Sequence, residues 1–213
     1  ETLRVLIKEC RMDLPPGLPP MASGLFGFLG YDMVRDMERL PDTNPDPIGL
    51  PDAIMVRPTM ICIFDRLEDN ATLVTPVWPQ AGTSARAAYE AAQERLADAV
   101  SDFERTLPFR RDSAEGLDAL PKPQANMSKE DFKAMVETCK EYIRAGDAFQ
   151  IVPSQRFSLP FKLPPLSLYR SLRRINPSPF LIFFDYGDFT IVGSSPEILV
   201  RLRDNTVTIR PLA

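Results

Sequence analysis

The chain has 213 residues, of which 44% are hydrophobic and 25% are charged, a composition typical of globular proteins rather than of disordered or fibrous ones. The formal net charge is -4 and the basic residues are scattered, which argues against a nucleic-acid-binding surface. Histidine is absent, which excludes Ser-His-Asp and Cys-His catalytic groups and imidazole metal sites within these residues.

Neither a signal peptide nor a bilayer-spanning run is visible, because the longest apolar runs, such as residues 180–184, are too short. Cys10, Cys62 and Cys139 stand far apart and form no CxxC pair, so a zinc or redox motif is not expected. An odd number of cysteines without a secretory signal indicates a reducing, cytoplasmic location. Acid–base chemistry in this chain would fall to Glu, Asp, Lys, Tyr or Cys.

The sequence of the amino-terminal part predicts short strands between proline-rich loops. A helix or strand near residues 3–7 leads into a proline-rich loop at 14–20. The glycines within residues 24–32 predict a strand that a neighbouring backbone approaches closely. The later elements expected here are a short helix (33–40), a loop (41–53) and two strands, with a hairpin turn at Asp69-Asn70 between them. The first strand would run from residues 53–57 on through 59–64, and the second would span 72–77.

Two helices are predicted on either side of a polar, proline-containing linker at residues 108–127. The first spans residues 84–107, with an apolar face made by Tyr89, Leu96, Val100, Phe103 and Leu107. The second begins after the N-cap Ser128 and ends at the C′ residue Gly146. Its apolar stripe consists of Phe132, Met135, Val136, Cys139 and Ile143.

The remaining residues predict a strand at 148–157, a helix over 166–175, and strands near 180–185, 189–193, 198–203 and 206–210. Turns at Gly187-Asp188 and Asp204-Asn205 would make the last four strands an antiparallel meander. Helices flanking antiparallel strands, without regular βαβ alternation, indicate the α+β class.

Three segments could carry chemistry, and each also has a simpler interpretation. The strand after Gly146 would present Gln150, Val152, Ser154 and Arg156 on one face, which suits either a polar site or a solvated face. The turn at residues 176–180 (NPSPF) is either a preorganised ligand contact or a helix stop. In residues 193–197 (GSSPE), Glu197 is either a general acid beside apolar Ile198 and Leu199 or a turn residue.

The order of these segments is more specific than any one of them. GDAFQIVPSQRF, NPSPF, GSSPE and IRPLA, in this order, resemble the chorismate-binding domain of the anthranilate synthase component I family. GLFGFLGYDMVRDMERLP resembles a glycine-rich segment in the amino-terminal part of the same subunit, so the resemblance covers about residues 21–213. It implies an incomplete chorismate-utilising α+β sandwich. Residues 1–122 would belong to the amino-terminal region and residues 123–213 to the first part of the chorismate-binding domain.

The resemblance implies a lyase of tryptophan biosynthesis that converts chorismate and ammonia to anthranilate and pyruvate. Ammonia would come from glutamine through a partner amidotransferase subunit, magnesium would assist the reaction, and tryptophan would inhibit it by feedback. Glu197 matches a catalytic carboxylate of the family, and Gln150 stands where water-adding relatives carry a lysine base. One wall of the tryptophan pocket would consist of Asn176, Pro177, Pro179, Phe180 and Leu181.

Several features bear on how far the resemblance extends. Ala213 stands where aminodeoxychorismate synthase typically has a nucleophilic lysine, so alanine favours anthranilate synthase. Pro153 and Leu181 depart from commoner residues of the family, and Leu181 affects the expected inhibitor affinity. The LLES segment of the tryptophan pocket, the family's continuation after Ala213, its catalytic histidine and its magnesium-binding glutamates are absent, so no metal site is expected in this chain.

The missing segments, the lack of an initiator Met and the end on a strand predict an incomplete subunit that makes no anthranilate by itself. The alternatives are aminodeoxychorismate synthase component I and a non-catalytic module that binds tryptophan.

Overall fold

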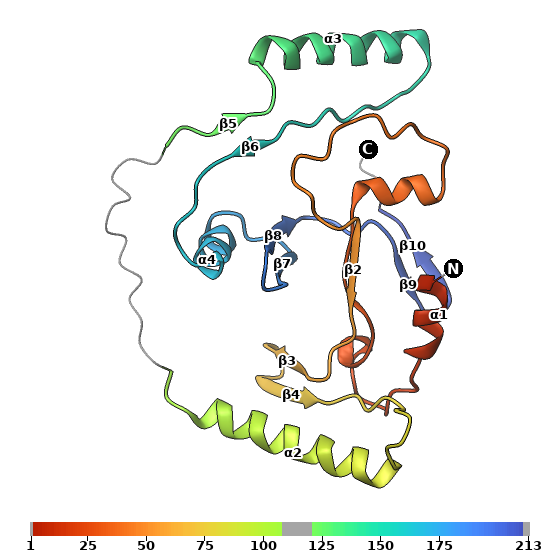
Figure 1. Ribbon diagram of the computed structural model, residues 1–213, viewed down its shortest axis with the longest axis vertical. Coiled ribbons are helices and arrows are strands. Elements are labelled where there is room, and N and C mark those ends of the chain that lie inside the picture. The colour runs from red at the N-terminus through yellow and green to blue at the C-terminus, as the bar shows by residue number, and fades with distance from the viewer. Residues whose placement is uncertain (1, 108–120, 211–213) are drawn as a thin grey trace. The chain divides into compact units, whose positions relative to one another are not determined.

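The computed structural model describes residues 2–107 and 121–210 (Figure 1). The chain divides into two compact units, Glu1–Pro108 and Phe109–Ala213. The predicted boundary between residues 122 and 123 refers to regions of the family and stays a prediction. Most of the linker expected at residues 108–127 lies outside the described residues, and Gln124–Ala125 within it form a short strand.

Within residues 2–107, the first unit contains two helices, two 3-10 segments and two antiparallel strand pairs. In chain order its elements are α1 (Thr2–Glu9), η1 (Pro20–Ala22), β1 (Phe26–Leu29), η2 (Tyr31–Asp36), β2 (Ala53–Val56), β3 (Ile61–Asp65), β4 (Asn70–Val74) and α2 (Ala85–Glu104). β1 pairs with β2 and β3 pairs with β4. The short helix predicted at residues 33–40 is instead the 3-10 segment η2, which begins earlier.

The glycines of β1 permit the close approach that the sequence predicts. Gly27 pairs with Met55, and a Cβ placed on Gly27 would lie 1.8 Å from the backbone oxygen of Ile54. The backbone N–H of Gly30 donates to the carbonyl oxygen of Asp52 at 2.6 Å. No side chain fits at Gly27 unless the two strands separate.

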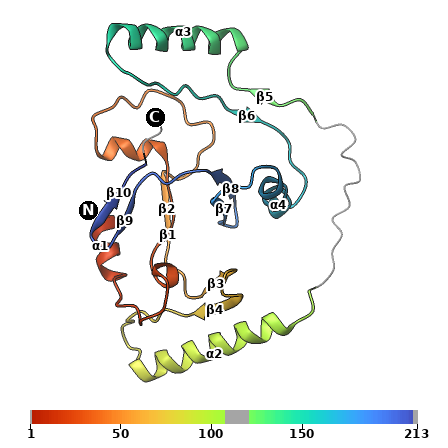
Figure 2. The same ribbon diagram turned by 180° about the vertical axis from the view of Figure 1, so that it is seen from behind.

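Helix α2 lies along the β3–β4 hairpin, as both views show (Figures 1 and 2). Ser84 is the N-cap of this helix, because its hydroxyl accepts a hydrogen bond from the N–H of Ala87 at 3.2 Å. Part of the predicted apolar face meets the hairpin: Leu96 is half-buried, and the ring of Phe103 packs edge-on against Phe64 of β3 with a centroid separation of 5.9 Å. Tyr89, at the border of this face, is 60% exposed. The most deeply buried position of the helix is Ala92, which is 4% exposed and lies on the same side as Leu96 and Phe103.

Within residues 121–210, the second unit contains two further helices and three short antiparallel strand pairs. Its elements are β5 (Gln124–Ala125), α3 (Lys129–Ala145), β6 (Phe157–Ser158), α4 (Pro165–Ile175), β7 (Phe180–Asp185), β8 (Thr190–Ser195), β9 (Arg201–Arg203) and β10 (Thr206–Thr208). The pairs are β5 with β6, β7 with β8, and β9 with β10. The predicted meander is therefore wrong in one respect: β8 and β9 do not pair.

Helix α3 has the ends that the sequence predicts. The hydroxyl of Ser128 accepts from the N–H of Asp131 at 3.0 Å, and Gly146 takes the left-handed conformation with φ of 85°. Its apolar stripe is half-exposed along its length, with Ile143 at 41%.

Few side chains are deeply buried in the described ranges. The buried hydrophobic residues there are Cys10, Ala22 and Ala92, whereas Phe149 is 96% and Leu199 88% exposed. Apolar surface of this extent is typical of proteins that bury it against further polypeptide. None of the helices in these ranges is long and apolar enough to cross a membrane.

Candidate functional site

The β7–β8 hairpin brings together two of the segments singled out in the sequence. Helix α4 ends where the N–H of Asn176 donates to the carbonyl oxygen of Leu172 at 2.8 Å. The chain then enters β7, whose Phe180 pairs with Ser195 and whose Leu181 pairs with Ser194. The antiparallel register thus places residues 176–181 beside residues 193–197 of the returning strand.

Two serine side chains fasten these segments to each other. The hydroxyl of Ser194 donates to the backbone oxygen of Asn176 at 3.2 Å. The hydroxyl of Ser178 donates to the backbone oxygen of Ser195. The first of these hydrogen bonds is exposed and the second is partly buried. Sequence reasoning missed these serines as positioning residues, although both lie inside the motifs.

Helix α4 covers this hairpin from one side (Figures 1 and 2). The ring of Tyr169 packs against that of Phe183 with a centroid separation of 5.6 Å and an interplanar angle of 60°. Tilted aromatic pairs of this kind are favourable beyond the area that they bury. The helix that leads into the NPSPF turn is therefore anchored on the strand that follows it.

Glu197 lies directly after β8, at a corner fixed by Ser195. The hydroxyl of Ser195 donates to the backbone oxygen of Glu197 at 3.0 Å and accepts from its N–H at 3.4 Å. Glu197 is half-buried, and its neighbour Ile198 is half-buried as well, whereas Leu199 is exposed. These two hydrogen bonds fix the backbone of Glu197 at the end of β8.

The residues expected to form one wall of a tryptophan pocket are mostly accessible. Asn176, Pro177 and Pro179 are exposed, Phe180 is 42% exposed, and Leu181 is half-buried. They lie in one continuous stretch at the carboxyl end of α4 and the start of β7. As they stand, they form a surface that a second wall could close.

Gln150 is exposed and does not lie in a strand. The strand predicted over residues 148–157 is wrong except at its end, because β5 offers a partner only to Phe157–Ser158. The alternation of the faces is nonetheless kept: residues 150, 152, 154 and 156 are exposed, and the residues between them are half-buried.

Hydrogen bonds hold this extended segment beside the chain that precedes α3. The side-chain amide of Gln155 donates to the carbonyl oxygen of Met127 at 3.3 Å, and the N–H of Arg156 donates to Oδ1 of Asn126 at 2.9 Å. In the described ranges no hydrogen bond joins Gln150 to Glu197. The roles assigned to both residues stay predictions. Ala213 lies outside the described residues.

The part of the chain that the structure describes offers no cluster of metal-binding side chains. Within residues 2–107 and 121–210, no group of three or more His, Cys, Asp or Glu side chains could hold a metal ion. Glu197 is thus not accompanied by further carboxylate ligands in this part of the chain.

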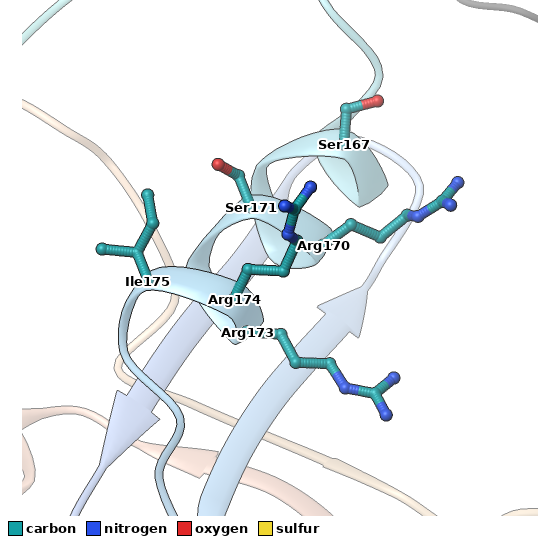
Figure 3. Close-up of a pocket in the computed structure, with 6 residues that line it drawn as sticks. All are labelled: Ser167, Arg170, Ser171, Arg173, Arg174 and Ile175. Carbon is teal, nitrogen blue, oxygen red and sulfur yellow. The ribbon is translucent and has the colours of Figure 1, made fainter.

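An open surface pocket on α4 was not anticipated from the sequence. It has a volume of about 850 Å³ and lies on the outer face of α4. Figure 3 shows its lining residues, which are Ser167, Arg170, Ser171, Arg173, Arg174 and Ile175. The three guanidinium groups point in different directions instead of converging on one ligand (Figure 3). None of the predicted site residues lines this cavity.

Comparison with known proteins gives a consistent result. The family model described as chorismate binding enzyme matches residues 4–213. Anthranilate synthase component 1 of Cereibacter sphaeroides is 54% identical over 213 residues, which is 100% of this chain and 42% of that protein. The protein of the same name from Pseudomonas putida is 42% identical over 206 residues, which is 93% of this chain and 40% of that protein.

A solved structure is similar over almost all of the chain. The crystal structure of anthranilate synthase component I from Streptococcus pneumoniae TIGR4 gives a TM-score of 0.84 at 30% identity, and the match covers 98% of this chain and 46% of that chain. The α+β class with antiparallel strands is confirmed by this likeness. The present chain spans less than half the length of these relatives.

Proposed function

This chain belongs to the chorismate-binding enzyme family, and from that premise we propose that it is the amino-terminal and central part of an anthranilate synthase component I. The observation that carries the proposal is the junction of the NPSPF and GSSPE segments through the hydroxyls of Ser178 and Ser194. Identity of 54% to the Cereibacter sphaeroides protein along the full chain supports it. The exposed apolar surface supports the idea that further polypeptide completes the fold.

The complete protein, on this proposal, is a lyase of tryptophan biosynthesis. It takes chorismate and ammonia to anthranilate and pyruvate, and a partner amidotransferase subunit supplies the ammonia from glutamine. The three free cysteines suit a reducing cytoplasm. Magnesium would be held by the carboxy-terminal part of the complete subunit.

Glu197 is the proposed general acid that protonates the departing hydroxyl of chorismate. Its half-buried position and the fixed backbone on either side of it suit this role, because a proton donor must be held within hydrogen-bond reach of the leaving oxygen. Gln150 is proposed to face the substrate without acting as a base, since an amide side chain does not take up a proton at neutral pH.

Residues 176–181 are the proposed inner wall of the tryptophan inhibitor site. Asn176, Pro177, Pro179, Phe180 and Leu181 supply it. The hydrogen bond from Ser194 to Asn176 and that from Ser178 to Ser195 give this wall a direct connection to the corner that holds Glu197. Binding of tryptophan to the wall would thereby change the position of the Glu197 carboxylate.

The proposal is tested by measuring ammonia-dependent anthranilate formation with the complete subunit that contains this sequence. Glu197→Gln should lower kcat by about 10²-fold or more, because it removes the transferable proton and keeps the side-chain shape. Glu130→Gln, which alters an exposed carboxylate in the first turn of α3, is the matched control and should leave kcat unchanged. Equal activity of the two variants would refute the role of Glu197.

Two further measurements separate the alternatives. An amino group at ring position 2 of the product supports anthranilate synthase, whereas position 4 would mean aminodeoxychorismate synthase. Calorimetric titration of the 213-residue chain with tryptophan and with chorismate addresses the non-catalytic module. Tight tryptophan binding by this chain, with no gain when the rest of the subunit is present, would favour that module. Chorismate turnover by this chain alone would contradict the proposed incompleteness.

A further inference from the structure

The last residue of β8 is held firmly by the neighbouring strand. Ser195 pairs with Phe180 of β7, and its backbone oxygen accepts a hydrogen bond from the hydroxyl of Ser178. The next residue is Pro196, and a residue that precedes proline is restricted to extended backbone conformations. The half-buried side chain of Ser195 therefore starts from a fixed backbone.

That side chain reaches two residues further along the chain. The hydroxyl of Ser195 accepts from the N–H of Glu197 at 3.4 Å and donates to the backbone oxygen of Glu197 at 3.0 Å. A serine hydroxyl that bonds the backbone two residues further on forms an ST-turn. Pro196 lies between them, has no N–H and has its φ fixed by the ring. Glu197 is therefore the first residue after Ser195 that can donate a backbone hydrogen bond to this hydroxyl.

In the described part of the chain, a single side chain holds the backbone of Glu197. Among residues 2–107 and 121–210, its N–H and its carbonyl oxygen have no hydrogen-bond partner other than the hydroxyl of Ser195. β8 ends at Ser195 and β9 begins at Arg201, so Glu197 belongs to neither strand. Pro196 and Leu199 are both exposed, so packing around Glu197 is sparse. The direction in which Glu197 leaves the backbone thus depends on one hydroxyl.

We propose, on the premise that Glu197 is the general acid of the proposed function, that Ser195 is its positioning residue. The hydroxyl of Ser195 fixes the main chain of Glu197, so that the carboxyl group is presented to the departing oxygen of the substrate. Ser195 neither contacts the substrate nor transfers a proton. Its effect on the reaction is nonetheless large, because a catalytic group displaced by about 1 Å can lose about 10²-fold in rate.

Two other roles for this hydroxyl lead to different kinetics. A hydroxyl that bound the substrate would raise KM for chorismate when it was removed. A hydroxyl that only stabilised the fold would lower activity whether or not residue 197 was an acid. A positioning hydroxyl lowers kcat, leaves KM unchanged and acts only while Glu197 is present. The complete subunit that contains this sequence, assayed with chorismate and ammonia, separates the three roles.

Ser195→Ala removes the hydroxyl without adding atoms. It should lower kcat by about tenfold or more and leave KM for chorismate within about twofold, because the substrate still binds while the acid is misplaced. Ser195→Thr keeps the hydroxyl and should retain about half of kcat or more. An increase in KM with unchanged kcat in Ser195→Ala would overturn the proposal.

Thr206→Val is the matched control. It removes another hydroxyl that bonds the backbone two residues away, since Oγ1 of Thr206 donates to the carbonyl oxygen of Asp204 at 3.5 Å in the turn between β9 and β10. This variant should leave kcat and KM unchanged. A kcat for Ser195→Ala equal to that of Thr206→Val would refute positioning by Ser195.

A double variant distinguishes positioning from a general loss of structure. Once Glu197→Gln has removed the acid, no proton donor is left to position, so adding Ser195→Ala should lower kcat by less than about twofold more. A further tenfold loss in the Glu197→Gln background would overturn the proposal. If circular dichroism shows that Ser195→Ala fails to fold, Ser195→Cys replaces it, because the thiol is close in size and a weak hydrogen-bonding group.

The same variants show which of the two residues lacks its role. If Glu197→Gln leaves kcat unchanged, Glu197 is not the general acid, and the proposed function loses that assignment together with the role of Ser195. If Glu197→Gln lowers kcat but Ser195→Ala does not, Glu197 keeps its role and only its positioning by Ser195 is refuted.

Discussion

The β1–β2 strand pair and the β7–β8 hairpin are both two-stranded and antiparallel, but different features hold their strands together. In β1–β2 the decisive feature is a missing side chain, since a Cβ on Gly27 would lie 1.8 Å from the backbone oxygen of Ile54. In β7–β8 the glycine is not essential, since a Cβ on Gly193 would make an ordinary 3.8 Å contact with Cβ of Ile182. In β7–β8, side-chain hydrogen bonds and ring packing hold the strands in place.

The difference suits the positions of the proposed functional residues. The hairpin that carries Glu197 and residues 176–181 is fastened by two serine hydroxyls and by the ring of Tyr169 on α4. These side-chain interactions fix the corner at Glu197 in addition to the backbone pairing of β7 with β8. The comparison of the two hairpins leads to four predictions, which run from the largest expected effect to the smallest.

Gly27→Ala should be the most damaging single-methyl change in the two hairpins. Insertion of a methyl group into a space that cannot hold it costs about 3 kcal/mol of the free energy of unfolding. Gly193→Ala is the matched change in β8 and should stabilise by about 0.5 kcal/mol, because alanine loses less backbone entropy than glycine. Urea denaturation of both variants measures the difference. Equal losses for the two variants would remove the contrast on which the comparison rests.

Tyr169→Ala should loosen α4 from β7. Loss of the half-buried ring and of its contact with Phe183 should cost about 2 kcal/mol of the free energy of unfolding. Tyr31→Ala in the other unit removes a ring that is 90% exposed and should change stability by less than about 0.5 kcal/mol. Hydrogen exchange of the β7 amides should accelerate only in the first variant. Unchanged exchange there would mean that the hairpin does not depend on α4.

Ser178→Ala tests whether hydroxyls fasten the NPSPF turn to the corner of Glu197. Removal of the hydrogen bond to the backbone oxygen of Ser195 should cost about 1 kcal/mol. Ser171→Ala, on the exposed face of α4, is the control and should be neutral or slightly stabilising, since alanine favours helices. Denaturation midpoints compare the two. If Ser178→Ala costs no more stability than Ser171→Ala, the hydroxyl of Ser178 does not fasten the two segments.

The smallest effect concerns the surface of α3. The hydrogen bond from Lys140, followed by its charge, lowers the pKa of Glu137 below its usual value of 4.5. A carboxylate whose pKa is lower in the folded state adds stability above the unfolded pKa, and this stability is lost as pH falls through the folded pKa. Because Glu137 is fully exposed, the loss below pH 4.5 should be small.

Lys140→Gln is the control for that shift. The pKa of Glu137, followed by NMR titration of its side-chain carboxyl, should return to about 4.5 in this variant. A pKa that stays lowered without Lys140 would assign the shift to another group.

The sequence by itself determined the features that depend on a few neighbouring residues. The cap at Ser128, the left-handed Gly146 and the close approach at Gly27 were all predicted correctly, because each follows from the covalent chemistry of one residue and its hydrogen-bonding reach. The turn at Asp204-Asn205 belongs to the same group, with φ of 50° and 58°. The order of the motifs, in the same way, was sufficient for the family.

Only the tertiary structure decided which surfaces meet. It left residues 148–156 without a strand partner and kept β8 and β9 apart. It also brought residues 176–181 against the corner of Glu197. These outcomes rest on burial and pairing between segments distant in sequence, and the free energy of such contacts is not encoded in local spacing.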